Sequence, residues 1–179
     1  PIDLTDILSR IGPGIVLVDG PHGSGKSTLI ETLRATLPKP RVYKTWRSLG
    51  GTARGCTLFP SLPISQALIF ITDFIVQEGE PRWTLCDRSP VSCHAYESTG
   101  RFVSSSEPIA DRMVAYYRML DRAHVFVSVT HILIEAPEGA GQAALMAGRP
   151  WQPNEPATFR RAFDLIPPGI GPKIIYRRP

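Results

Sequence analysis

The sequence predicts an α/β protein whose parallel sheet is covered by helices on both faces. β-prone and helix-prone segments alternate along the chain, which is typical of such sheets. The apolar run of residues 15–19 leads directly into a glycine-rich loop, as a buried parallel strand does, and a second run, residues 83–87, ends on an acid. Ligands of parallel sheets bind beyond the carboxyl ends of the strands, so a site is expected at these two strand ends.

The composition indicates one globular domain over residues 1–179. The chain has 179 residues, of which 42% are hydrophobic, enough for a buried core, and no internal repeat or linker divides it. The formal net charge of +4 is compatible with a polyanionic ligand, such as a nucleotide or nucleic acid, and equally with ordinary surface charge.

Cysteine usage and hydropathy predict a cytoplasmic protein that does not enter a membrane. Cys56, Cys86 and Cys93 are odd in number and form no CxxC pair, which disfavours a disulfide framework or a zinc site. No stretch approaches the ~18 uncharged apolar residues of a transmembrane helix, and the N-terminal residues lack the pattern of a signal peptide.

Further elements are expected in the first half of the chain. Residues 26–37 have helical character and stop at a proline, residues 41–44 are a candidate second strand, and residues 64–77 are an apolar helix. Residues 45–63 contain glycine and proline without clear periodicity, so we expect a functional or mobile loop there.

The second half continues the alternation of strands and helices. After the strand at 83–87, the expected elements are helices at 89–96 and from 104–108 to about 123, a strand near 130–135, a helix at 137–147, a proline-rich loop at 148–156, a helix at 157–165 and a last strand at 173–176.

A glycine loop follows the first predicted strand. Residues 20–27, GPHGSGKS, match the phosphate-binding pattern GxxxxGK followed by Ser or Thr, between a strand and a helix as the motif requires. Its glycines let backbone N–H groups turn onto phosphate oxygens, and the helix N-terminus adds partial positive charge. Lys26 is expected to reach the β and γ phosphates of ATP, and Ser27 to bind Mg²⁺. The residues expected at the ATP phosphates are Gly20, His22, Gly23, Ser24, Gly25, Lys26, Ser27 and Thr28.

Two of these residues have a second interpretation. His22 lies at the variable tip of the loop, and an ordinary loop residue is the alternative to a functional one. Thr28 is expected to cap or pack the helix.

The second strand end carries an acid and an arginine. Asp87 fits as a ligand of a Mg²⁺-bound water or as a base for an acceptor hydroxyl, and Arg88 fits as a clamp on a phosphate oxygen. The alternative is a surface Asp-Arg pair without a function. Its place after a strand parallel to the one before the glycine loop favours the functional interpretation.

Three blocks of sequence resemble thymidylate kinases, within the thymidylate-kinase-like and deoxynucleoside-kinase branch of small P-loop kinases. They are DGPHGSGKST at 19–28, LIFITD at 68–73 and LCDRSPVSCHAY at 85–96. The match in order and spacing runs from about residue 14 to 100, and more loosely over 130–165. The resemblance implies a three-layer α/β/α P-loop fold with a five-stranded parallel sheet of order 2-3-1-4-5, and phosphoryl transfer from ATP.

The resemblance also implies an acceptor site. Arg47 falls where the family holds an acceptor phosphate, Phe70 where an aromatic ring stacks on the acceptor base, and Arg88 where the Asp-Arg motif holds the acceptor. Arg149 falls in the lid of about 148–156, where the family uses arginines on the transferring phosphate. The alternatives are core packing for Phe70 and solvated loop charges for Arg47 and Arg149.

Departures from the family pattern leave the acceptor open. Phe74 stands where thymidylate kinases carry a base-reading arginine, and the lid has one arginine and three prolines. A nucleoside monophosphate, a nucleoside, or a hydroxymethylated pyrimidine within DNA, as in some phage relatives, would each suit ATP-dependent transfer. For the last, the basic side chains of Arg41, Lys44, Arg47 and Arg54 could line a DNA backbone.

A different class of function is a nucleotide-binding switch without an acceptor. GTPases of that kind carry an NKxD-type motif for the base, and none is found. A homodimer is compatible with the sequence.

Overall fold

Five parallel strands form one sheet in the order β2-β3-β1-β4-β5. This computed structural model describes residues 4–44, 83–98, 118, 128–148 and 151–177. In sheet order the strands are β2 (Arg41–Lys44), β3 (Trp83–Asp87), β1 (Gly14–Asp19), β4 (Ser128–Glu135) and β5 (Lys173–Arg177). The predicted α/β class, the parallel sheet and its order are therefore confirmed.

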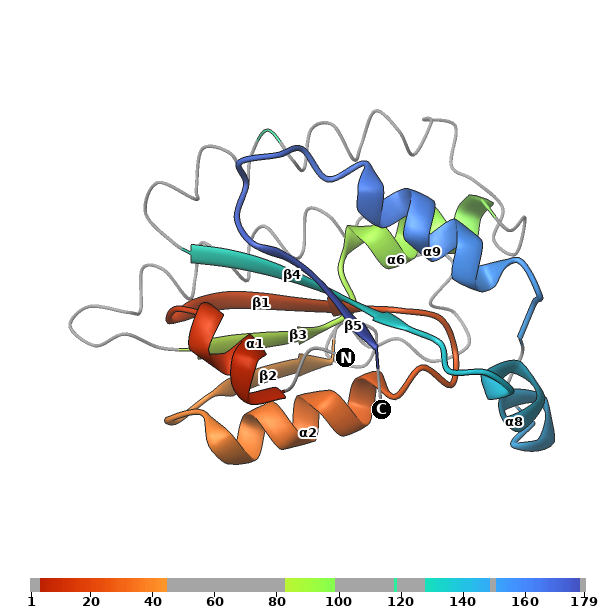
Figure 1. The fold of residues 1–179 in the computed structure, drawn as a ribbon, viewed down its shortest axis with the longest axis horizontal. Helices are drawn as coiled ribbons and strands as arrows, with labels where there is room; N and C mark the ends of the chain where they lie inside the picture. Colours follow the sequence, from red (N-terminus) through yellow and green to blue (C-terminus); the bar gives the residue numbers. More distant parts are fainter. Residues whose placement is uncertain (1–3, 45–82, 99–117, 119–127, 149–150, 178–179) are drawn as a thin grey trace.

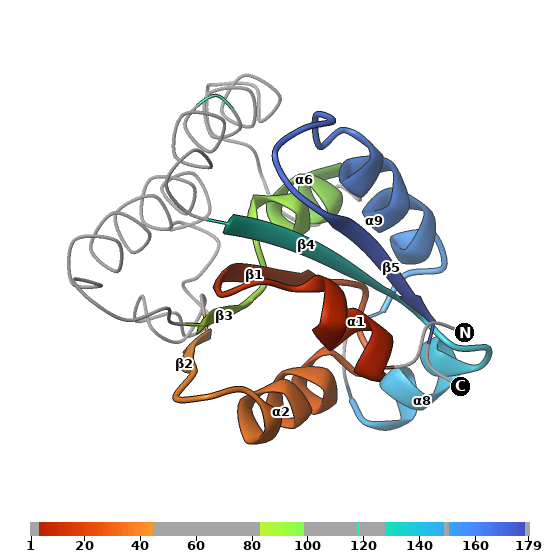
Figure 2. The ribbon, with the colours of Figure 1, turned by 60° about the vertical axis from the view of Figure 1, so that its left-hand side comes forward.

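Helices lie on both faces of the sheet (Figures 1 and 2). They are α1 (Leu4–Arg10), α2 (Lys26–Thr36), α6 (Pro90–Ser98), α8 (Ala140–Met146) and α9 (Glu155–Asp164). One face is covered by α1 and α2, and the other by α6 and α9, which pack against each other. This arrangement is compatible with a three-layer α/β/α fold.

The core explains why β1 and β4 read as apolar runs. Val16 and Val18 of β1 and Ile132 and Ile134 of β4 pack in one cluster with the helices α1 and α2. Because side chains alternate across a strand, the intervening residues, such as Leu17, point to the face that α6 and α9 cover. Both faces of these strands are thus buried, as expected of a parallel sheet.

Among the described elements, most bounds agree with the expected ones, and the differences are at the ends. The helices expected at 64–77 and from 104–108 to about 123 lie outside the described residues, apart from residue 118. The helix expected at 157–165 begins earlier, at Glu155, and the helix expected at 137–147 is shorter, running from Ala140 to Met146. The helix α1 was not predicted. It is only seven residues long, and it is held by Ile7, which is fully buried in the core.

The parallel strands bring their carboxyl ends to one edge of the sheet. Val18 pairs with Asp87 across β1 and β3, so Asp19 and the loop after it lie beside the residues that follow Asp87. No helix in the described part of the chain is long and apolar enough to cross a membrane.

Part of the expected acceptor site lies outside the described residues. This applies to Arg47, Phe70 and Arg149, and to the acceptor loop expected at 45–63. The single-domain organisation stays a prediction.

Candidate functional site

The glycine loop, residues 20–27, joins β1 to α2 at the carboxyl edge of the sheet. Gly25 is the N-cap of α2 with φ of 90°, and Gly23 has φ of 77°. A Cβ on Gly23 would lie 2.9 Å from the carbonyl oxygen of Ala140, so a larger residue would collide with the start of α8. The loop therefore needs glycine at both positions for its left-handed backbone, and at Gly23 also for space.

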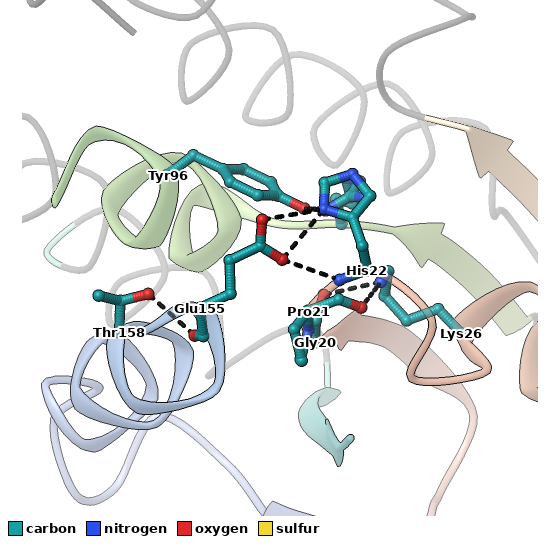
Figure 3. A network of polar contacts seen from close by, with 8 residues as sticks. Gly20, Pro21, His22, Lys26, Tyr96, Glu155 and Thr158 are labelled. Atoms are coloured by element: carbon teal, nitrogen blue, oxygen red, sulfur yellow. Dashed lines mark hydrogen bonds and ion pairs between the residues drawn. The ribbon is translucent and has the colours of Figure 1, made fainter. Parts of the chain in front are cut away.

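Lys26 is buried at the base of the glycine loop. Its Nζ donates hydrogen bonds to the carbonyl oxygens of Gly20, at 2.7 Å, and Pro21, at 2.8 Å (Figure 3). The side chain thus turns back over the loop that precedes it, and the ammonium lies against the loop backbone.

The pKa of Lys26 is unusually low for a lysine. Burial lowers it, and the neighbouring Arg88 guanidinium lowers it further, to about 7. Three carboxylates oppose the shift, those of Asp87, Asp19 and Glu155. A buried cation with a pKa near neutrality gains charge when an anion binds beside it, so this lysine suits an anionic ligand.

The hydroxyl side chains of the loop differ in exposure. The Oγ of Ser24 is buried and has no hydrogen-bond partner within the described part of the chain. Buried polar atoms are normally paired, so an orphaned hydroxyl inside a loop points to a missing ligand. Ser27 and Thr28 are exposed in the first turn of α2, where their hydroxyls face solvent rather than the core.

Asp19 ties the end of β1 to the start of α6. Its carboxylate accepts hydrogen bonds from the backbone N–H of Ser89, at 2.9 Å, and from the hydroxyls of Ser89 and Ser92, each at 2.5 Å. Burial raises the pKa of Asp19, and the bonds from the two serines counter that rise. The carboxylate therefore fixes the position of the segment that carries Arg88.

Arg88 has a strained backbone at the end of β3. Its φ of 82° is in the left-handed region, which non-glycine residues rarely adopt. The backbone is held by a hydrogen bond from its N–H to the carbonyl of Val18, and the guanidinium Nη1 donates to the hydroxyl of Tyr96 at 2.7 Å. The Arg88 Cζ also lies 5.1 Å from the centre of the Tyr96 ring. Such strain concentrates at functional sites, where surrounding contacts maintain it.

Asp87 and Arg88 lie beside the start of the glycine loop, because Asp87 pairs with Val18 and the Arg88 N–H donates to the Val18 carbonyl. Both also influence the charge of Lys26. Asp87 is half-buried.

Three residues that are distant in sequence meet at the tip of the glycine loop, and we call them the His22 cluster: His22, Tyr96 and Glu155. The backbone N–H of His22 donates to Glu155 Oε2 at 3.1 Å, and the ring Nδ1 lies 3.1 and 3.2 Å from the two carboxylate oxygens (Figure 3). The Tyr96 hydroxyl lies 3.2 Å from the same Nδ1. The Glu155 side chain is 0% exposed, so this is a buried carboxylate against a glycine loop.

Neighbouring groups fix the His22 cluster in place. Glu155 begins α9, where the helix dipole favours a carboxylate, and Thr158 Oγ1 donates to the Glu155 carbonyl at 2.9 Å. The ring of Phe159 meets the Tyr96 ring edge-on, with centroids 5.2 Å apart. The cluster therefore joins α6 and α9 to the loop tip.

The roles of Glu155 and Tyr96 were missed from the sequence. Glu155 lies within the proline-rich segment that was expected to be a lid, and Tyr96 served only as part of a family motif. The residues Asn154, Glu155 and Pro156 do carry a helix-start signal, with an acid and a proline in the first turn. That signal locates the start of α9 but says nothing of its contact with the loop.

The predicted magnesium ligands, Ser27 and Asp87, fit a particular kind of site. The described residues hold no group of three or more His, Cys, Asp or Glu side chains that could bind a metal by themselves. A hydroxyl and a carboxylate near a phosphate-binding loop instead suit a hard cation whose other ligands are phosphate oxygens and water.

Comparison with known proteins adds no family to these observations. The chain matches no protein-family model, and a search of the curated proteins finds no match.

Proposed function

We propose that the protein is an ATP-dependent phosphotransferase of P-loop type that transfers the γ-phosphate to a nucleotide or nucleoside. The observation that carries this proposal is Lys26, buried beneath the glycine loop with its Nζ on the carbonyl oxygens of Gly20 and Pro21, at the sheet edge where β1 pairs with the end of β3. A candidate donor site and a candidate acceptor site would therefore lie side by side, as a two-substrate kinase requires.

The donor half would consist of the glycine loop and the start of α2. The loop N–H groups and the helix N-terminus would hold the triphosphate, the orphaned Ser24 hydroxyl would gain a partner, and Lys26 would neutralise charge on the β and γ phosphates. Ser27 and, through water, Asp87 would hold Mg²⁺, which would withdraw charge from the phosphates.

The acceptor half would begin at Arg88, whose guanidinium is fixed by Tyr96. The resemblance to thymidylate kinases supports adding Arg47 and Phe70 as acceptor contacts, and Arg149 as a lid residue that excludes water. In this proposal the catalytic groups are Lys26, Arg88 and Arg149, with Asp87 on the metal side.

A second candidate function is a kinase for a hydroxymethylated pyrimidine within DNA. The observation that favours it is Phe74, which stands where thymidylate kinases read a free pyrimidine nucleotide with arginine. The basic balance of the chain, with a formal net charge of +4, suits a polyanionic substrate.

Label transfer from γ-labelled ATP tests the proposal. The acceptors offered are deoxynucleosides, their monophosphates, and DNA with and without hydroxymethylated bases. We expect label on one acceptor class, and loss of that label in Lys26→Ala, because its charge on the transferring phosphate is gone. Lys39→Ala, which removes an exposed lysine after α2, is the matched control and keeps the wild-type rate.

Two results would contradict the kinase assignment. Full label transfer by Lys26→Ala would show that the donor site is not at the glycine loop around Lys26. Release of free phosphate without any labelled acceptor would favour a nucleotide-binding switch.

A further inference from the structure

Glu155 is an unusual neighbour for a loop that is proposed to bind polyphosphate. It places a fully buried carboxylate within hydrogen-bond distance of the backbone N–H of His22, at the tip of that loop. A negative charge there repels phosphate oxygens, so phosphate binding alone gives no reason for it. The contact of the same carboxylate with the His22 ring supplies a reason.

The carboxylate fixes which nitrogen of His22 carries the proton. An ionised carboxylate only accepts hydrogen bonds, so Nδ1, which lies 3.1 and 3.2 Å from its two oxygens, must be the donor. In the neutral ring the basic lone pair is then on Nε2. A second bond, from the His22 backbone N–H to Glu155, holds the residue in place. A carboxylate that orients an imidazole in this way is the arrangement of a general base.

The His22 cluster also reaches the proposed acceptor half. The Tyr96 hydroxyl lies 3.2 Å from His22 Nδ1 and accepts a hydrogen bond from Arg88 Nη1 at 2.7 Å. The two rings lie with centroids 5.4 Å apart. The Tyr96 hydroxyl therefore connects the imidazole, on the loop that would hold the donor phosphate, with the arginine that would hold the acceptor.

We propose that His22 is the general base of the reaction, that Glu155 is its positioning residue, and that the acceptor is a hydroxyl group rather than a phosphate. This inference rests on the proposed kinase function. His22 Nε2 takes the proton of the acceptor O–H while the oxygen forms a bond to the γ-phosphorus. The bond from that phosphorus to the β–γ bridging oxygen breaks, and ADP leaves with its electron pair.

The choice of a hydroxyl follows from acid–base chemistry. A hydroxyl becomes a good nucleophile only as it loses its proton, and a positioned base assists that loss. A monophosphate already carries ionised oxygens at neutral pH and has no such proton to lose.

Charged groups around the imidazole come from each element packed against it. The charged groups are Glu155 on α9 and Arg88 after β3, which reaches the ring through the neutral but titratable Tyr96 on α6; Lys26 lies at the base of the same loop. The Glu155 carboxylate acts on Lys26 as well as on His22. A change at Glu155 can thus alter ATP affinity, so binding must be measured separately from the rate.

The test combines kinetics with a chemical rescue. The variants are Glu155→Gln, His22→Ala and, as the matched control for loss of a carboxylate, the exposed Glu31→Gln. With the acceptor classes above and γ-labelled ATP, we expect label on a hydroxyl, and a fall in kcat of about 10²–10⁴-fold in His22→Ala, because general base catalysis contributes this much. Added imidazole should restore part of that rate. Glu31→Gln should match the wild type.

Two further readouts separate a base from a structural contact. The dissociation constant of a fluorescent ATP analogue should stay near the wild-type value in His22→Ala. Glu155→Gln keeps the volume of the side chain and should lower kcat, so it remains informative even if His22→Ala folds poorly.

Each contrary result has its own meaning. Label only on monophosphates would overturn the hydroxyl acceptor and the base, while the kinase proposal stands. An unchanged kcat in both His22→Ala and Glu155→Gln would mean that the His22 cluster has only a structural role. A change in KM alone, without rescue by imidazole, would mean the same. Failure of the wild type to bind the ATP analogue would refute the kinase proposal itself, and the base with it.

Discussion

Lys26 is a residue whose charge depends on its surroundings. In the folded chain its pKa is about 7, against 10.5 for an unperturbed lysine. Burial is the main cause, so the folded state resists protonation that the unfolded chain accepts freely. This difference makes stability depend on pH in a definite direction.

Folding stability should rise with pH between about 7 and 10.5. In this window the unfolded chain binds a proton at Lys26 that the folded chain has released, so each step upward favours the folded state. From pH 7 to 9 the free energy of unfolding should rise by about 2 kcal/mol. The destabilising effect of burying Lys26 disappears completely only above the pKa of the unfolded chain. Urea unfolding of the wild type and Lys26→Met at the two pH values should show this rise in the wild type alone.

Ser92 is expected to matter for stability although it lies at the edge of the site. Its hydroxyl donates to the buried Asp19 carboxylate, and removal leaves a charged acceptor short of a partner. Ser92→Ala should lower the free energy of unfolding by about 1–3 kcal/mol. Ser27→Ala, at an exposed position, should change it by less than about 0.5 kcal/mol. Equal stability of the two variants in urea would contradict the role given to Asp19.

At the scale of elements, α9 links the core to the glycine loop. Its first residue, Glu155, contacts the loop tip, and its buried face carries Phe159, which is 0% exposed and meets the Tyr96 ring. The packing of α9 in the core therefore sets the position of Glu155, and through it the position of His22.

Phe159→Ala should therefore affect both stability and the site. Loss of the buried ring leaves a cavity and should cost about 3–5 kcal/mol of unfolding free energy. Arg161→Ala, an exposed change on the same helix, should cost less than about 0.5 kcal/mol. Chemical denaturation measures both, and the spectroscopic signal of the Tyr96 environment should change only in the first.

At the scale of the whole molecule, the parallel direction of the strands brings the residues of the candidate site to one edge of the sheet. The described groups come from the end of β1, the end of β3, the starts of α2 and α9, and from α6. A ligand that contacts several of these elements should stabilise the entire fold.

ATP with magnesium is expected to raise the melting temperature. At 100 times its dissociation constant, a ligand that binds only the folded state adds about 2.7 kcal/mol. For a chain of this size that corresponds to a shift of about 5–10 °C. Thermal unfolding with and without Mg-ATP should show the shift in the wild type and Lys39→Ala. Lys26→Ala should show little of it, and an equal shift there would place the nucleotide elsewhere.

The parts of the structure that the sequence predicted are those with local causes. The strands β1 and β3 and the glycine loop follow from apolar runs, prolines and glycines within a few residues. The pairing of His22 with Glu155 joins positions 133 residues apart, and no local pattern encodes such a contact. The helix α1 is too short to show periodicity, and the burial of Ile7 in the core helps to stabilise it.

The left-handed backbone of Arg88 has a consequence for how this chain could change over generations. At φ of 82° glycine or asparagine would fit with less strain, so selection for stability alone would favour replacing the arginine. Such a replacement would remove the guanidinium that Tyr96 holds beside the loop. A library sorted only for heat resistance would therefore tend to lose this side chain, whereas one sorted for phosphoryl transfer would keep it at a cost in robustness.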